Sequence, residues 1–129
     1  MEHITIPAQI DKLDVVQDFI SAIIPDEKLL NTLLIATEEI FVNIAHYAYT
    51  PDSGDVFVSA DIKPNLITLE FRDSGKPYDP VSKKDPDTSL PVEEREIGGL
   101  GIFMVKKLMD DVRYEYRDGM NCLRIAKNM

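Results

Sequence analysis

The stretch TEEIFVNIAHYAY, residues 37–49, places polar side chains in a segment that is otherwise apolar enough to be buried. Glu39 and Asn43 are four positions apart, so in a helix they share one face beside the apolar stripe. Because an unpaired buried polar group costs about 1–3 kcal/mol, this arrangement needs a reason. A carboxylate and a carboxamide oxygen could ligate a hard cation or orient a water or hydroxyl. Taken alone, the pair fits a solvated helix edge better.

A third polar residue, Asp73, ends the apolar run LEFRD and is followed two positions later by Gly75. A carboxylate at the end of a strand accepts hydrogen bonds, and the exocyclic amine of adenine is a suitable donor. Gly75 can adopt a positive φ and lets a flat ring approach the backbone closely. Asp-Ser-Gly is also an ordinary turn sequence, so the motif alone leaves both interpretations open.

The segment GGLGIF, residues 98–103, places Gly98, Gly99 and Gly101 where a helix is expected to begin. Glycines at this position expose backbone N–H groups that can bind phosphate oxygens, and the helix dipole adds attraction. No Gly-Lys-Ser/Thr follows, and G-x-G-x-x-G is not completed after a strand, so neither the P-loop nor the dinucleotide fingerprint is present. The alternative is a flexible loop that ends in a closely packed helix.

Periodicity predicts the elements that must position these residues. Helical spacing predicts three amphipathic helices: one over residues 13–23 that stops near Pro25, one from the N-cap Asp26 to about Tyr47, and one over residues 98–111. Alternating runs predict five strands, over residues 3–7, 56–62, 67–71, 112–117 and 122–127, with KPN and Asp118-Gly119 as hairpin turns.

This order of elements predicts an α+β protein, a two-layer α/β sandwich with a mostly antiparallel sheet of about five strands. The three helices are expected to cover the single apolar face of that sheet. We expect residues 1–129 to form a single domain. Residues 76–97 show little periodicity, and such a long segment indicates a functional lid or a disordered loop.

Composition excludes several classes of protein. The net charge of −9 argues against direct nucleic-acid binding, which needs clustered Lys and Arg. No apolar run approaches the length of a membrane span, and the N-terminal residues do not resemble a secretory signal. The single cysteine, Cys122, excludes an internal disulfide and is expected to pack in a strand. These features predict a cytoplasmic protein.

The three motifs occur together in a specific order: Glu-x-x-x-Asn on a helix, Asp-x-Gly after a strand, a long segment, then a glycine-rich helix start. This pattern resembles the N, G1 and G2 boxes of the GHKL ATPase superfamily, which includes gyrase and the histidine kinases and has the Bergerat fold. ATEEIFVNIAHYAY, RDSGKPYDP and GGLGIFMV most resemble the anti-sigma-factor serine/threonine kinases. The resemblance covers nearly the whole chain.

The resemblance implies a site for ATP and Mg²⁺ with assigned roles. Asn43 would hold Mg²⁺ against the phosphates, and Glu39 would be the general base. Asp73 would read adenine, with Gly75 as its partner in the turn. The phosphates would be held by Gly98, Gly99, Leu100 and Gly101, and Asn121 would lie near the adenine.

The resemblance also implies partners, a STAS-domain anti-anti-sigma protein as substrate and a sigma factor to sequester, and suggests a homodimer. Two further functions stay open: an ATP-binding module that sequesters a partner without catalysis, and an ATPase that transfers phosphate to water.

The chain departs from the family at one position, because Tyr47 stands where the family commonly has a histidine and His46 precedes it. The role of that histidine is not assigned to either residue, and we expect His46 to be structural. Tyr47 and Tyr49 are expected to close the helix end, and Met104 and Met109 to fill the core. Arg95 could reach a phosphate, although a solvated loop arginine is the simpler interpretation.

Overall fold

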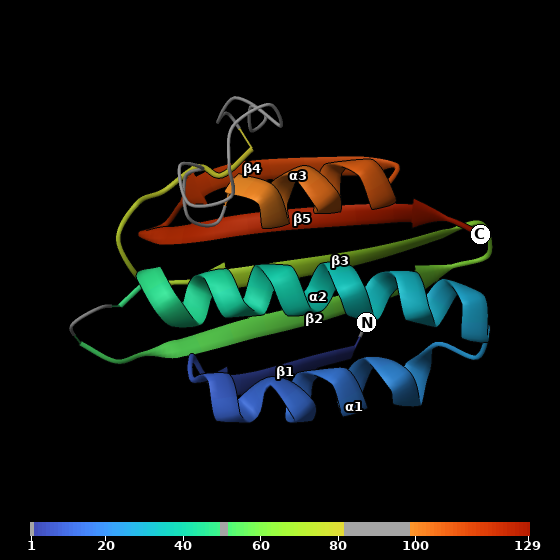
Figure 1. Cartoon of the computed structure of the whole chain (residues 1–129), viewed down its shortest axis with the longest axis horizontal. Coiled ribbons are helices and arrows are strands. Elements are labelled where there is room, and N and C mark those ends of the chain that lie inside the picture. The colour runs from blue at the N-terminus through green and yellow to red at the C-terminus, as the bar shows by residue number, and fades with distance from the viewer. Residues whose placement is uncertain (1, 50–51, 82–98) are drawn as a thin grey trace.

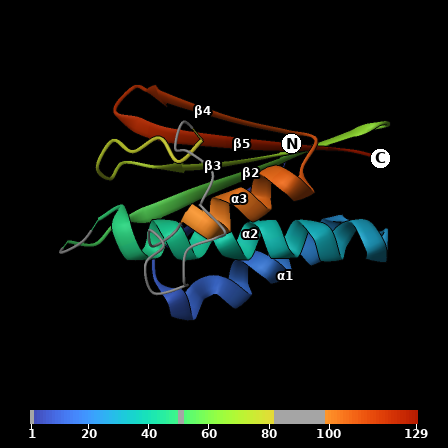
Figure 2. The ribbon, with the colours of Figure 1, turned by 45° about the horizontal axis from the view of Figure 1, so that its top comes forward.

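The computed structural model describes residues 2–49, 52–81 and 99–129, with two layers (Figures 1 and 2). One layer is a five-stranded sheet in the order β1-β2-β3-β5-β4, in which every neighbouring pair is antiparallel. The strands are β1 (Glu2–Pro7), β2 (Asp55–Lys63), β3 (Leu66–Asp73), β4 (Asp111–Arg117) and β5 (Met120–Asn128).

The second layer consists of three helices on one face of the sheet, as Figure 2 shows. They are α1 (Leu13–Ile23), α2 (Glu27–Tyr47) and α3 (Gly99–Leu108), with a short 3₁₀ helix (Ile10–Lys12) before α1. The predicted α+β sandwich is therefore confirmed. None of the helices in the described ranges is long and apolar enough to cross a membrane.

Helix α2 lies between α1 and α3 and carries two of the candidate site residues (Figure 1). It begins where the sequence predicts, because the Asp26 side chain accepts hydrogen bonds from Lys28 N at 3.0 Å and Leu29 N at 3.2 Å. Its buried residues Leu33, Ala36, Thr37, Ile40 and Phe41 recur at helical spacing and face the sheet.

The sheet contributes the other half of the core through alternate residues. In β3, Ile67, Leu69, Phe71 and Asp73 are buried. The opposite face is polar; Glu70 there accepts a hydrogen bond from its register partner Arg124, with 2.8 Å between Oε2 and Nη2. The inward row of β3 therefore ends in a carboxylate at the edge of the core.

The turns explain why the strands end where they do. Asp118 and Gly119 have φ values of 56° and 75°, so the connection of β4 to β5 is a tight two-residue turn with positive φ at both positions. Pro64 and Asn65 alone connect β2 to β3, because Lys63 continues the strand. Both hairpins are those that the sequence predicts.

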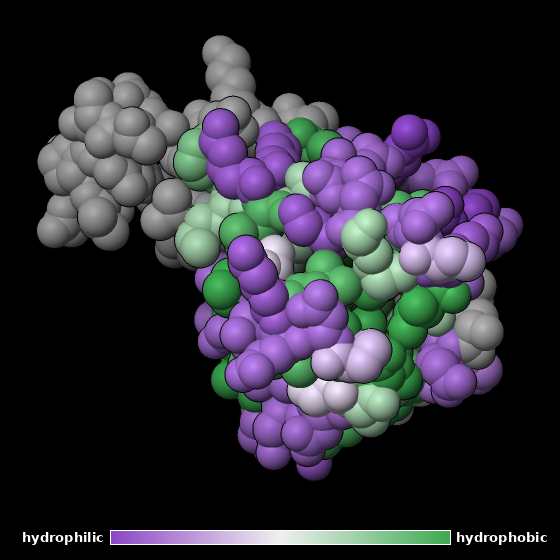
Figure 3. All heavy atoms as spheres, turned by 90° about the vertical axis from the view of Figure 1, so that its right-hand side faces the viewer, coloured by the Kyte–Doolittle hydropathy of each residue, from purple (hydrophilic) through white to green (hydrophobic). Residues whose placement is uncertain are grey.

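Two apolar residues expected in the core are exposed instead. Ile62, last in the inward row of β2, is 42% exposed, and Met104 on α3 is 39% exposed, whereas Met109 is buried as predicted. Ile62 is exposed although its strand alternates correctly, since it lies beside the turn at the end of the sheet. Figure 3 shows that hydrophobic side chains reach the surface between hydrophilic ones at this end of the molecule.

Candidate nucleotide site

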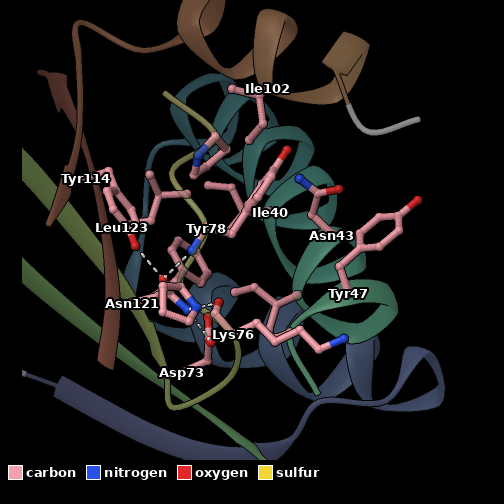
Figure 4. Close-up of a pocket in the computed structure, with 15 residues that line it drawn as sticks. Ile40, Asn43, Tyr47, Asp73, Lys76, Tyr78, Ile102, Tyr114, Asn121 and Leu123 are labelled. Carbon is pink, nitrogen blue, oxygen red and sulfur yellow. Dashed lines mark hydrogen bonds between the residues drawn. The ribbon is translucent and has the colours of Figure 1, made fainter. Parts of the chain in front are cut away.

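A cavity of about 380 Å³ opens between the C-terminal half of α2, the sheet and the beginning of α3. Much of its wall is apolar, because Ile40, Phe71, Ile102 and Leu123 line it. Its polar lining includes Asp73 with Asn121 on the sheet and Asn43 on α2, as Figure 4 shows. An apolar slot with a few fixed polar groups is the usual form of a small-molecule site.

Helix α2 supplies one wall through residues at helical spacing, Ile40, Asn43, Ile44, Tyr47 and Ala48. Asn43 is half-buried, and Figure 4 shows its carboxamide on the side of the cavity opposite Tyr114.

Glu39 is half-buried one helical turn before Asn43 but is not among the residues that line the cavity. Its role as a base stays a prediction. Its neighbour Glu38 is exposed.

Asp73 lies at the end of β3 and is only 4% exposed. Its Oδ1 accepts hydrogen bonds from Gly75 N and from Asn121 Nδ2, each at 3.0 Å. Burial raises the pKa of this carboxyl, and the hydrogen bonds from Asn121 and Gly75 partly offset that rise. Within the described part of the chain, both hydrogen bonds end on Oδ1, so Oδ2 is the oxygen available to a ligand.

Asn121 is the register partner of Asp73 on β5 and is 7% exposed. Its Nδ2 donates to Asp73 Oδ1 and, at 2.8 Å, to Lys76 O. Its Oδ1 accepts from Tyr78 N at 3.0 Å and from the Tyr114 hydroxyl. The structure thus brings Asn121 to the predicted site, in direct contact with the residue predicted to read adenine.

The structure favours glycine at position 75 for a reason other than the predicted positive φ. Among the glycines of the described ranges, only Gly119 has a positive φ. A Cβ at Gly75 would lie 2.2 Å from Ala48 O, so the glycine allows the loop to pack against the end of α2. Lys76 N donates to the same carbonyl at 2.9 Å.

Two tyrosines near the end of α2 have different surroundings. The Tyr49 hydroxyl donates to Asp55 O at 2.6 Å and accepts from Ser74 N at 2.8 Å, so this residue closes the helix end as predicted. Tyr47 is 44% exposed and lines the cavity, which the sequence analysis missed. Tyr47 follows Asn43 by four positions and Ile40 by seven, so helical spacing alone could have placed it on the same face of the helix. His46 is exposed and meets the Tyr47 ring edge-on, so it lies outside the core.

The glycine motif is placed in part. Gly99 is the first residue of α3, Leu100 and Gly101 follow in its first turn, and Ile102 lines the cavity. The N-terminus of α3 therefore adjoins the cavity, where its N–H groups can attract an anion. Gly98 and Arg95 lie outside the described residues, as does most of the predicted lid. Three residues that sequence reasoning missed, Lys76, Tyr78 and Tyr114, also line the cavity.

The comparisons with known proteins agree with this geometry. Residues 6–127 match the family described as the histidine kinase-like ATPase domain. Curated relatives named serine-protein kinase RsbW, from Bacillus cereus and Bacillus anthracis, are 32% identical over 98 residues, which is 73% of this chain and 61% of theirs. A relative of the same name from Bacillus thuringiensis is 30% identical over the same coverage.

The chain thus spans about three fifths of the length of these relatives. An ATPase domain of this kind implies a site for ATP, and the cavity beside α2 and α3 has the composition such a site needs. The chain belongs to the histidine kinase-like ATPase family, and within it resembles the RsbW serine kinases.

Proposed function

We propose that the chain is an ATP-dependent protein serine/threonine kinase that acts as an anti-sigma factor and phosphorylates a STAS-domain antagonist. The observation that carries the proposal is the buried Asp73, whose Oδ1 is held by two donors at one end of an apolar cavity. The Bacillus relatives that are named serine-protein kinases support the choice of a protein substrate.

Asp73 gives the cavity its preference for adenine. A flat ring between Ile40 and Leu123 would bury apolar area, and its exocyclic amine could donate to the second oxygen of Asp73. Guanine has a carbonyl oxygen at the equivalent position, which would face the carboxylate as a second acceptor and be disfavoured.

Asn43 has the chemistry to hold Mg²⁺. Its carboxamide oxygen is a hard ligand, and its half-buried place on the cavity wall leaves room for phosphates and water, which Mg²⁺ retains as partners. When bound, the ion would neutralise charge that develops on the transferred phosphoryl group. The backbone N–H groups at the start of α3 would add to that neutralisation.

Glu39 is the proposed general base. It would accept the hydroxyl proton of the substrate serine as the serine oxygen bonds to the γ-phosphorus and the bond to the β-phosphate oxygen breaks, leaving ADP. Its place one turn from Asn43 on a rigid helix would hold it close to the metal ligand. Catalysis of this type is mainly positioning and electrostatics.

The decisive experiment incubates the protein with labelled ATP and candidate STAS-domain proteins. Label should pass to the STAS protein, and Glu39→Ala should lower the transfer rate by about 10²–10⁴-fold without weakening ATP binding. Glu38→Ala, on the exposed neighbour, is the matched control and should transfer normally.

Two outcomes would contradict the kinase assignment. Phosphate release without labelled protein would make the chain an ATPase. ATP binding with neither product would make it a module that sequesters its partner, such as a sigma factor. Transfer that survives Glu39→Ala would overturn the base assignment alone.

A further inference from the structure

We propose that Asn121 is a positioning residue that holds the Asp73 carboxylate and the loop of residues 76–78, and does not itself contact the nucleotide. This inference rests on the proposed ATP site. It replaces the role that the family resemblance implies for Asn121, a place among the nucleotide-binding groups, with an indirect one.

The hydrogen-bonding capacity of the Asn121 side chain is full. A carboxamide has two N–H donors and an oxygen with two lone pairs. Both donors are used, by Asp73 Oδ1 and Lys76 O, and both lone pairs are used, by Tyr78 N and the Tyr114 hydroxyl. A direct contact with adenine would have to break one of these bonds.

The orientation of the Asn121 amide is fixed by its backbone partners. Lys76 O can only accept a hydrogen bond, so the atom 2.8 Å from it must be the nitrogen. Tyr78 N can only donate, so the atom 3.0 Å from it must be the oxygen. These two backbone groups therefore fix which end of Asn121 faces Asp73, and it is the donor.

This arrangement orients the Asp73 carboxylate. Asn121 and Gly75 both donate to Oδ1 of Asp73, and these two bonds fix the plane of the carboxylate. Oδ2 is then the oxygen that accepts a hydrogen bond from a ligand in the cavity. Asn121 also joins the loop to β5, since Lys76 O and Tyr78 N are held by the same side chain (Figure 4). The Ala48 carbonyl holds Lys76 N from the other side.

The groups that face Asp73 allow a titration test. Tyr78 and Lys76 from the loop, Tyr114 from β4 and Tyr47 from α2 line the same cavity, and Asp79 adjoins Tyr78 in the chain. Burial raises the pKa of the Tyr114 phenol, so it stays protonated at neutral pH and donates to Asn121. Because the bond from Asn121 lowers the pKa of Asp73, its loss should raise that pKa.

The experiment measures ATP affinity against pH for the wild type, Asn121→Leu and Tyr114→Phe. Both substitutions are uncharged, so neither moves the pKa of Asp73 by adding charge. Asn121→Leu should weaken ATP binding about tenfold, as expected for one lost hydrogen bond to a charged group, and should move the pH midpoint of binding upward. Tyr114→Phe removes a bond to Oδ1 of Asn121 but keeps the donor to Asp73, so its midpoint should match the wild type.

A double-mutant cycle with Asp73→Asn separates an indirect from a direct role. If Asn121 acts through Asp73, Asn121→Leu should weaken binding of the Asp73→Asn protein much less than it weakens binding of the wild type. Fully additive losses, or an unchanged pH midpoint in Asn121→Leu, would overturn the inference. Should the leucine variant fail to fold, Asn121→Ser takes its place in both measurements.

Failure of the proposed function would look different. If the wild type bound no ATP, the nucleotide site itself would be wrong. The role of Asn121 would then be tested by the ¹³C titration of the Asp73 carboxyl, whose midpoint should still rise in the Asn121 variant. An unchanged midpoint there would overturn the inference too.

Discussion

The carboxylate of Asp73 is almost completely buried. Burial raises its pKa above the ordinary value, so the ionised form costs the folded state free energy. By linkage, the stability that the raised pKa of Asp73 contributes to the folded state is present below the ordinary pKa of an aspartate. It is lost as the pH rises through the pKa that Asp73 has in the folded protein. At neutral pH a charged Asp73 therefore makes the fold less stable, which is reasonable only if a ligand uses the charge.

Replacing Asp73 by Asn should separate stability from binding. The amide oxygen can still accept from Gly75 N and Asn121 Nδ2, while the buried charge disappears. We expect the melting temperature without nucleotide at pH 7 to be equal to or above that of the wild type. ATP affinity should fall about 10–100-fold, because an N–H donor replaces the acceptor at the adenine amine.

Thermal unfolding with and without ATP measures both effects of Asp73→Asn in one experiment. The analogous change Asp79→Asn, in the same segment but outside the cavity lining, is the control. Unchanged ATP affinity in Asp73→Asn would contradict the whole assignment of the site.

At the scale of elements, the loop of residues 74–78 is held from three sides. Tyr49 binds Ser74 N, the Ala48 carbonyl binds Lys76 N, and Asn121 binds both Lys76 O and Tyr78 N. A loop whose backbone groups are bonded in this way is ordered before any ligand arrives, which lowers the entropic cost of binding.

Gly75→Ala should disturb this loop. The new Cβ would lie 2.2 Å from the Ala48 carbonyl oxygen, and because that atom is backbone, the loop or the end of α2 must shift. We expect the free energy of unfolding to fall by about 1–3 kcal/mol. Chemical denaturation measures the change, and Ser74→Ala on the exposed neighbour, which removes only the 3.2 Å contact of its Oγ with the Tyr49 hydroxyl, should cost markedly less. Equal stability of the two variants would show that the contact is easily relieved.

The elements themselves were largely predictable from sequence, because their signals are local. The Asp26 cap, the helical period of α2 and the Asp118-Gly119 turn each depend on residues within a few positions. The motif spacing also led to Asn43 and Asp73, and the family resemblance led to Asn121; all three line one cavity.

What could not be predicted depends on contacts between distant segments. The close approach of Gly75 to Ala48 and the four bonds of Asn121 arise from tertiary packing that no local pattern encodes. Met104 is exposed although it belongs to a helix with an apolar face, because helical spacing alone does not say which residues the neighbouring elements cover.

At the scale of the whole molecule, one core joins the two layers. Phe41 on α2 and Phe71 on β3 are among its largest fully buried side chains. Because Phe71 and Ile40, the neighbour of Phe41, line the cavity, the core and the site share a wall. A loss of packing in this region should therefore affect stability and binding together.

Phe41→Ala tests this dependence. Removing a fully buried phenylalanine should cost about 3–5 kcal/mol out of a total stability of about 5–15 kcal/mol. Phe57→Ala, on the outward row of β2 where Arg72 lies over the ring at 5.9 Å, is the matched control and should cost markedly less. Urea unfolding gives both values, and similar losses would contradict the assignment of the two faces.

The pairing of β3 with β5 has a consequence for how the protein folds. Asp73 and Asn121 are register partners 48 positions apart, whereas the β2–β3 and β4–β5 hairpins need only short-range closure. Long-range pairings form late, because the chain must lose loop entropy before their contacts compensate. In a partly folded chain with both hairpins complete, Asp73 and Asn121 would not yet lie side by side. Ligand binding would then appear only once β3 has paired with β5, and a bound ligand would slow unfolding by resisting the separation of these two strands.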